Sequence, residues 1–244
     1  MNVAIIAAGG RGARMGGGMG RAPKQFLEIA GTPVVVHTLR RFEACSTVAE
    51  VVVVVPRSEV QAFLELAEKF GLRKLARVIA GGETRAESVW RGLEELRAED
   101  VGVVAVHDAV RPLVTPEEID ATVRAAEATG AAILAARAVD TVKESEGEGT
   151  ARVARTLDRS RLWHAQTPQC FRHDLLRRAY ESARAFGFEA TDDSSLVERL
   201  GAPVRIVEGG ARNIKITTPQ DLALAEMIVQ SSKFKGMKPL DFEL

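Results

Sequence analysis

Short runs of valine and isoleucine that alternate with helix-forming segments restrict most strongly how this chain can fold. Runs that are apolar along their whole length are typical of strands in a parallel sheet that is covered by helices on both faces. We therefore predict an α/β fold with a doubly wound, mostly parallel, Rossmann-like sheet. The strand candidates lie at residues 3–8, 50–55, 77–80, 103–107 and 131–136.

Capping residues predict where several helices begin and end. Thr32 followed by Pro33 predicts the start of the first helix. Thr84 predicts the start of another, and Thr115 that of a third, which should end at Gly130. Further helices are expected near 173–186 and 193–200 and from about Pro219 to Gln230, with a strand in "PVRIVEG" between the last two.

The alternation of strands and helices stops at residue 137. Two short alternating stretches then flank the acidic turn "ESEGEG", which predicts a β-hairpin arm at about 137–160. Because a lone hairpin is poorly stable in water, we expect the arm to pack on a second copy of the chain and form a homodimer. We predict a single domain over 1–230 and a loosely ordered tail over 231–244.

The composition argues against several classes of partner. The 33 basic residues equal the 33 acidic ones, so no overall charge attracts nucleic acid or a membrane surface. Cys45 and Cys170 have no metal-ligand spacing and are predicted to be buried thiols. With no signal-peptide pattern either, the sequence favours the cytoplasm.

A glycine-rich segment follows the first strand candidate, in "VAIIAAGGRGARMGGGMGRAPKQF" at 3–26. It lacks the Gly-Lys-Ser/Thr ending of a P-loop, and Met15 stands where a dinucleotide fingerprint needs its third glycine. Bare backbone amides and nearby arginines nevertheless suit phosphate oxygens. We interpret the segment as a binding loop for the phosphates of a nucleotide.

Several motifs together resemble one family of enzymes. "AGGRGARM", "PKQF", "GGETRAESV", "HDAVRP", "DTVK", "LDRSRLWHAQTPQ", "TDDSS" and "NIKIT" occur in the order and spacing of 2-C-methyl-D-erythritol 4-phosphate cytidylyltransferases. The resemblance covers roughly residues 2–230 and implies a sheet of the nucleotidyltransferase type. The sequence departs from the pattern in a longer loop between Met15 and Pro23 and in Glu83, where aspartate is common.

The resemblance implies a reaction between CTP and 2-C-methyl-D-erythritol 4-phosphate that gives 4-diphosphocytidyl-2-C-methyl-D-erythritol and pyrophosphate. The attacking phosphate oxygen is already ionised at neutral pH, so no general base is needed. The reaction instead needs two anions to be aligned and their charge neutralised. By resemblance, this catalytic role falls to Arg14, Lys24 and Lys215.

The resemblance also assigns the binding residues. CTP would be bound by Ala8, Gly9, Gly10, Gly12, Gly82, Glu83, Ser88 and Asp108. The polyol phosphate would be bound by Arg111, Thr141, Arg159, Thr167, Thr191 and Lys215. Mg²⁺ is expected with the triphosphate, and Asp108, after a strand, is the candidate ligand for metal or ribose. Thr141 and Arg159 lie on the arm and would reach a substrate across the dimer, whereas Arg85 would hold the loop.

Alternatives remain open at this point. A ribitol 5-phosphate cytidylyltransferase would share the nucleotide loop, and a catalytically silent CTP-binding regulator would not need all three catalytic cations. A glycosyltransferase typically has an Asp-x-Asp metal pair, and "TDDSS" lacks that spacing. Trp163, His107 and His164 have no companion ligands nearby in the sequence, and we predict structural roles for them.

Overall fold

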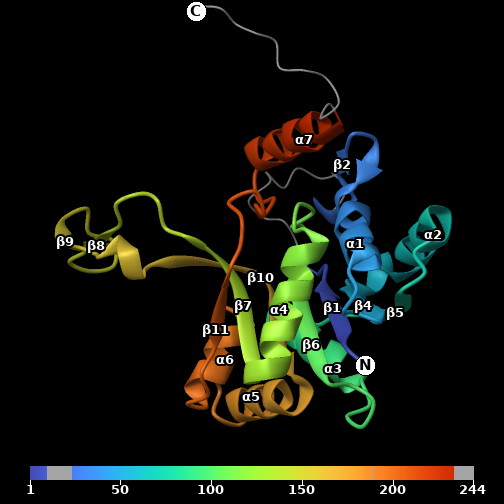
Figure 1. The fold of residues 1–244 in the computed structure, drawn as a ribbon, viewed down its shortest axis with the longest axis horizontal. Coiled ribbons are helices and arrows are strands. Elements are labelled where there is room, and N and C mark those ends of the chain that lie inside the picture. Colours follow the sequence, from blue (N-terminus) through green and yellow to red (C-terminus); the bar gives the residue numbers. More distant parts are fainter. Residues whose placement is uncertain (10–23, 189, 234–244) are drawn as a thin grey trace, which may run out of the picture.

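Seven strands form one sheet in the computed structural model, which describes residues 1–9, 24–188 and 190–233 (Figure 1). Their order across the sheet is β11-β7-β10-β6-β1-β4-β5, and every pairing is parallel except the two that β10 makes. The mostly parallel sheet is thus confirmed. The strands are β1 (Val3–Ala7), β4 (Glu50–Val55), β5 (Leu75–Ala80), β6 (Val103–Asp108), β7 (Ala131–Arg137), β10 (Trp163–Arg172) and β11 (Arg205–Glu208).

Strand β10 was not predicted as part of the sheet, although it lies between β6 and β7 and runs antiparallel to both. Half of the residues in its sequence, "WHAQTPQCFR", are polar and one is Pro168, so it lacks the apolar run that marks the other strands. The register with β7 shifts between Ala165 and Gln169, around this proline. A local interruption of the ladder therefore accommodates a residue that cannot donate a backbone hydrogen bond.

Helices cover both faces of the sheet, as predicted for a doubly wound fold (Figure 1). Alternate side chains of β1 enter different cores: Ile6 packs on one side and Ile5 on the other. The first core is formed with α1 (Val34–Ala44), α2 (Val60–Phe70) and α4 (Pro116–Thr129). The second is formed with α3 (Arg85–Glu94), α5 (His173–Ala185) and α6 (Asp193–Arg199).

The helix caps agree with the sequence in two of three cases. Thr115 forms a capping box with Glu118, α4 ends at Gly130 in a positive-φ conformation, and the Thr84 side chain accepts from a backbone N–H of α3. The predicted start of the first helix at Thr32 is wrong. Thr32–Pro33 forms strand β3, which pairs with β2 (Glu28–Ile29), and α1 begins only at Val34.

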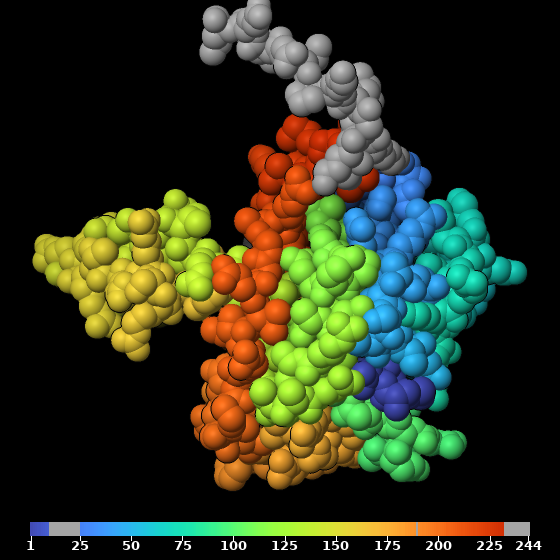
Figure 2. Space-filling model, in the orientation of Figure 1, coloured from blue at the N-terminus to red at the C-terminus, as the bar shows by residue number. Residues whose placement is uncertain are grey.

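The predicted hairpin arm is present and stands away from the sheet (Figures 1 and 2). It contains β8 (Lys143–Ser145) and β9 (Val153–Thr156), whose residues are all exposed, and the short 3₁₀-helix η4 (Arg159–Arg161). Two further 3₁₀-helices, η2 (Lys24–Phe26) and η3 (Arg57–Glu59), belong to the body of the molecule.

The last helix, α7 (Pro219–Lys233), packs over the β2–β3 hairpin through a small apolar core that includes Ile29, Ile216 and Ala225. It runs three residues past the predicted end at 230, so residues 231–233, which were expected in the tail, are helical. Residues 234–244 lie outside the described part of the chain. None of the helices in the described residues is both long and apolar enough to cross a membrane.

Candidate functional site

Several of the predicted site residues that the structure describes lie where strands β1, β5 and β6 end. Strand β1 leads to Gly9, β5 to Gly82, and β6 ends at Asp108 itself. The three strands run parallel within the sheet, so their carboxyl ends lie along the same edge. This edge is the usual location of ligand sites in open α/β sheets.

Gly9, Gly81, Gly82 and Ser88 form a close-packed group at this edge. The Gly82 N–H donates to Ser88 Oγ at 3.2 Å, and Ser88 Oγ donates to the Thr84 carbonyl at 2.9 Å. A Cβ atom at Gly9 would lie 3.3 Å from Ser88 Oγ, and one at Gly81 only 2.6 Å from it. Glycine is therefore required by space at 81, where a Cβ atom would crowd both Ser88 and Val54.

Two other predicted nucleotide residues, Ala8 and Glu83, offer mainly backbone. Ala8 is buried and its N–H donates to the Val54 carbonyl. The N–H of Glu83 donates to Glu87 Oε2 at 2.7 Å, while Glu83 itself is exposed. An aspartate in place of Glu83 would leave this backbone bond unchanged.

Asp108 holds three cations, and together with them and Thr167 it forms what we call the Asp108 cluster: Arg85, Asp108, Arg111, Thr167 and Lys215. Arg85 Nε donates to Asp108 Oδ1 at 3.0 Å, and Lys215 Nζ lies 2.8 Å and Arg111 Nε 3.5 Å from Oδ2. Burial alone would raise the pKa of Asp108, but the three cations, Arg85 foremost, hold it below the usual range. The carboxylate is therefore ionised at neutral pH.

Arg85 connects this cluster to a second buried carboxylate. Its Nη2 lies 2.8 Å from Oδ2 of Asp193, whose Oδ1 accepts a short hydrogen bond from the Tyr180 hydroxyl. Although burial lowers the pKa of Arg85, the two carboxylates raise it overall. The prediction that Arg85 holds structure agrees with these contacts, whereas Asp193 and Tyr180 were not predicted.

Thr167 is hydrogen-bonded on two sides. Its Oγ1 accepts from the Asp108 N–H at 3.1 Å and lies 3.0 Å from His107 Nδ1. His107 is fully buried, and its Nε2 lies 3.2 Å from the Arg111 carbonyl. Burial lowers the pKa of His107 to about 4, against the opposing effect of Asp108. A structural role for His107, as predicted, fits these contacts.

Buried amide side chains form hydrogen bonds with residues of the cluster and with Asp193. Asn213 Nδ2 donates to Gln166 Oε1 and to the Thr167 carbonyl, and the Asn213 carbonyl accepts from Arg111 Nη1 at 2.8 Å. Gln169 Oε1 accepts from the Asp193 N–H at 3.0 Å. These amides also escaped prediction, although the motifs "TPQ" and "NIKIT" contain or adjoin them.

The described residues do not by themselves fit a magnesium site. Both oxygens of Asp108 are already within 3.0 Å of a cationic nitrogen. In the described part of the chain, no three histidine, cysteine, aspartate or glutamate residues form a group that could hold a metal. Asp108 thus binds the cationic side chains of its own chain, and its assignment as a metal ligand stays a prediction from the sequence.

The remaining predicted residues are not brought into this cluster. Gly10, Gly12 and Arg14 lie outside the described residues, and Lys24 is described only as the first residue of η2. Thr141 and Arg159 belong to the arm, which stands away from the sheet (Figure 1). Thr191 is exposed and precedes Asp192, the N-cap of α6.

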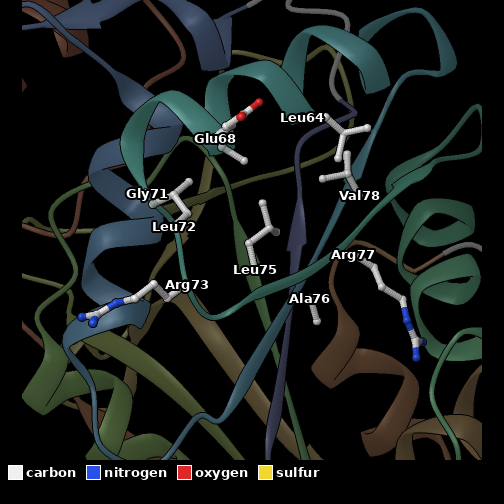
Figure 3. Close-up of a pocket in the computed structure, with 10 residues that line it drawn as sticks. Leu64, Glu68, Gly71, Leu72, Arg73, Leu75, Ala76, Arg77 and Val78 are labelled. Carbon is white, nitrogen blue, oxygen red and sulfur yellow. The ribbon is translucent and has the colours of Figure 1, made fainter.

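Two of the cavities among the described residues differ in their relation to the cluster. One, of about 800 Å³, lies between α3 and α5, with Arg85 of the cluster, Trp90 and Tyr180 in its wall. The other, of about 340 Å³, lies between α2 and β5. Figure 3 shows that aliphatic side chains such as Leu64 and Val78 line that second cavity. The side chains of Arg73 and Arg77, which also line it, extend away from Leu64 and Val78.

Comparison with known proteins gives one consistent result. The family profile of 2-C-methyl-D-erythritol 4-phosphate cytidylyltransferase matches residues 2–231. The chain belongs to this family. The resemblance drawn from the sequence motifs is therefore confirmed.

Individual relatives of the cytidylyltransferase family agree over nearly their full length. The protein of that name from Pelotomaculum thermopropionicum is 50% identical over 229 residues, which cover 93% of this chain and 94% of that one. The one from Geobacillus kaustophilus is 46% identical, covering 93% and 96%. The crystal structure of the Thermus thermophilus enzyme matches with a TM-score of 0.75 at 36% identity, covering 94% of this chain and 100% of that chain. That of the Anaerococcus prevotii synthase reaches 0.81 at 31% identity, covering 93% and 97%.

Proposed function

We propose that this chain transfers the cytidylyl group of CTP to 2-C-methyl-D-erythritol 4-phosphate and releases pyrophosphate, a step in the synthesis of isoprenoid precursors. A phosphate oxygen of the polyol phosphate forms a bond to the α-phosphorus, and the bond from that phosphorus to the pyrophosphate oxygen breaks. The observation that carries the proposal is the Asp108 cluster in a member of the cytidylyltransferase family.

The cluster suits a reaction between two anions. Lys215 and Arg111 are held by a carboxylate, so their positions are fixed before any substrate arrives. The Lys215 side chain is 40% exposed, so its ammonium remains accessible to a phosphate. No base is required, because the attacking phosphate is already ionised. Arg14 and Lys24 would add positive charge from the glycine-rich loop.

The nucleotide would bind beside the cluster. The group of Gly9, Gly82 and Ser88 provides bare backbone and one hydroxyl, which suit the edge of a cytosine ring. Arg85 begins α3 directly after this loop and also contacts Asp108. It would therefore keep the base pocket and the reacting phosphates at a fixed separation.

Magnesium and a second copy of the chain complete the proposal. Mg²⁺ would arrive on the phosphate oxygens of CTP, where it would screen charge and favour departure of pyrophosphate. The arm would bring Thr141 and Arg159 to the substrate of a partner chain, so that a homodimer forms the complete site. The exposed side chains of Val139 and Val153 on the arm favour such packing. We place the enzyme in the cytoplasm.

Pyrophosphate release by purified protein tests this function directly. The assay compares CTP with UTP and ATP, and 2-C-methyl-D-erythritol 4-phosphate with ribitol 5-phosphate, in the presence of magnesium. We expect turnover only with CTP and the methylerythritol phosphate. Turnover with ribitol 5-phosphate alone would support the proposed type of reaction but show that the polyol phosphate substrate was assigned wrongly. Folded protein that binds CTP but releases no pyrophosphate would instead be a regulator.

A further inference from the structure

The hydroxyl group of Thr167 has one hydrogen atom, and its surroundings determine where that hydrogen points. A hydroxyl can donate once and accept twice. The backbone N–H of Asp108 lies 3.1 Å from Thr167 Oγ1 and can only donate, so it occupies one lone pair of this oxygen. The hydrogen of the hydroxyl is left for another partner.

His107 is that partner, because its own hydrogen bonds fix its tautomer. The Arg111 carbonyl, 3.2 Å from Nε2, can only accept, so Nε2 carries a hydrogen. His107 is fully buried, and burial favours the neutral ring over the charged one. A neutral ring with its hydrogen on Nε2 has a bare Nδ1, which lies 3.0 Å from Thr167 Oγ1 and accepts the hydroxyl hydrogen.

We propose that His107 makes Thr167 a pure hydrogen-bond acceptor toward the substrate, so that Thr167 contacts a hydroxyl group of the polyol and not a phosphate oxygen. His107 is then a positioning residue that acts through Thr167. The inference deepens the proposed function and rests on it.

Electrostatics explains the selectivity that follows. The remaining lone pair of Thr167 would repel an anionic oxygen but attract a hydroxyl hydrogen. The positive groups of the cluster, Arg111 and Lys215, remain for the phosphate. The site thus distinguishes the hydroxyl oxygens of the substrate from its phosphate oxygens. A substrate bound in the reverse orientation would place its phosphate against the acceptor Thr167.

Nitrogen NMR of labelled histidine tests the tautomer without any substrate. We expect His107 at neutral pH to show a protonated Nε2 and an unprotonated, hydrogen-bonded Nδ1. His37, whose Nε2 lies 2.9 Å from the Ile29 carbonyl, is the internal reference. The Nδ1 resonance should move in Thr167→Val and stay in Thr167→Ser. A protonated Nδ1 at neutral pH would overturn the proposal, whether or not the enzyme turns over.

Kinetics with deoxy substrates tests the contact itself. Thr167→Val, compared with Thr167→Ser, should raise KM for the polyol phosphate about tenfold, the value of one hydrogen bond, and leave KM for CTP unchanged. With one analogue that lacks a single polyol hydroxyl, most of this penalty should disappear. An equal penalty with every deoxy analogue would point to a phosphate contact and overturn the proposal. If wild-type protein turns over no substrate at all, the proposed function fails while the NMR result still decides the tautomer.

Discussion

The Asp108 cluster and the hairpin arm use the same kinds of charged residue under opposite conditions. In the cluster, Arg85 and Asp108 have side chains only 30% and 8% exposed and are held by partners from several elements. In the arm, Arg155 and Glu144 pair across β8 and β9 with side chains 68% and 46% exposed. Water screens the second pair far more than the first, so the same pairing contributes differently to each region.

The difference suggests two ways of positioning the residues that bind the substrate. The cluster is organised within one chain, because each cation has a buried acceptor before ligand binds. In the arm, the described contacts of β8 and β9 pair these two strands with each other, and Arg159 Nη1 donates to the Val139 carbonyl. The proposed role of the arm in catalysis would therefore depend on a partner chain, whereas that of the cluster would not.

The largest expected effect is on activity, and it tests whether the two regions belong to different chains of one site. Lys215→Ala and Arg159→Ala should each lower kcat/KM by about 10²–10³-fold, because each removes a cation that stabilises the phosphates. Mixing the two variants after dissociation should restore about a quarter of wild-type activity, since half of the dimers would contain one intact site.

The control for this experiment is a mixture of Arg159→Ala with Lys143→Ala. Lys143 Nζ donates to Thr156 Oγ1 within the arm and is not assigned to the site, so Lys143→Ala alone should keep full activity. Size-exclusion chromatography with light scattering would follow exchange of subunits. If mixed Lys215→Ala and Arg159→Ala dimers form and stay inactive, the arm does not complete the site of its partner.

The second-largest expected effect is a difference in stability between variants of the Asp108 cluster and variants of the hairpin arm. Asp108→Asn removes the negative charge that three cations share, so we expect the free energy of unfolding to fall by about 4 kcal/mol. Glu144→Gln removes a carboxylate from an arginine in the same way but on the exposed arm, where we expect no measurable change. Urea denaturation of both variants measures the difference. Equal losses would show that burial does not distinguish the two regions.

The sequence predicts the elements of this fold better than their long-range contacts. The apolar strands and the Thr115 cap follow from local patterns, and Asp108 could be placed at the sheet edge because it ends an apolar run. Strand β10 was missed because polar residues and a proline hide it. Its central place depends on pairing with β6 and β7, which no local pattern specifies.

The same limit explains what was missed in the site. Arg85 meets Asp193, more than a hundred positions later, only because α3 and α6 cover the same face of the sheet. Asp193 resembled an ordinary residue of a helix first turn, and Tyr180 an apolar residue of α5. Gly9 and Gly82, by contrast, follow apolar runs, so the sequence could place them after the ends of strands.

The pH dependence of stability should also differ between the regions. The folded pKa of His107 is lowered to about 4, below its unfolded value of about 6.5. A lowered folded pKa gives stability that is fully present above the unfolded value and is lost as pH falls toward the folded one. We expect a loss of about 3 kcal/mol between pH 6.5 and 4.

Urea denaturation at pH 7, 5.5 and 4.5 measures this loss, and His107→Asn should remove most of it. His173, whose pKa burial also lowers, should leave a weaker dependence of stability on pH in that variant. The arm variant Glu144→Gln should keep the full wild-type dependence. An unchanged slope in His107→Asn would show that the buried histidine is not responsible.

The smallest effect tests the outermost contact of the cluster. Tyr180→Phe removes the hydroxyl that donates to Asp193, and the raised pKa of Tyr180, caused by burial and then by Asp193, keeps that hydroxyl protonated throughout the assay range. We expect about 1 to 2 kcal/mol less stability and a kcat/KM reduced several-fold, since Asp193 would hold Arg85 less firmly. Thr156→Val removes an exposed hydroxyl on the arm that accepts from Lys143 at 2.7 Å, and it should leave stability unchanged, because water replaces the lost bond. A Tyr180→Phe enzyme with wild-type kinetics but reduced stability would mean that Tyr180 supports the fold without positioning Arg85. Asp193 would then be the outermost residue that positions the Asp108 cluster.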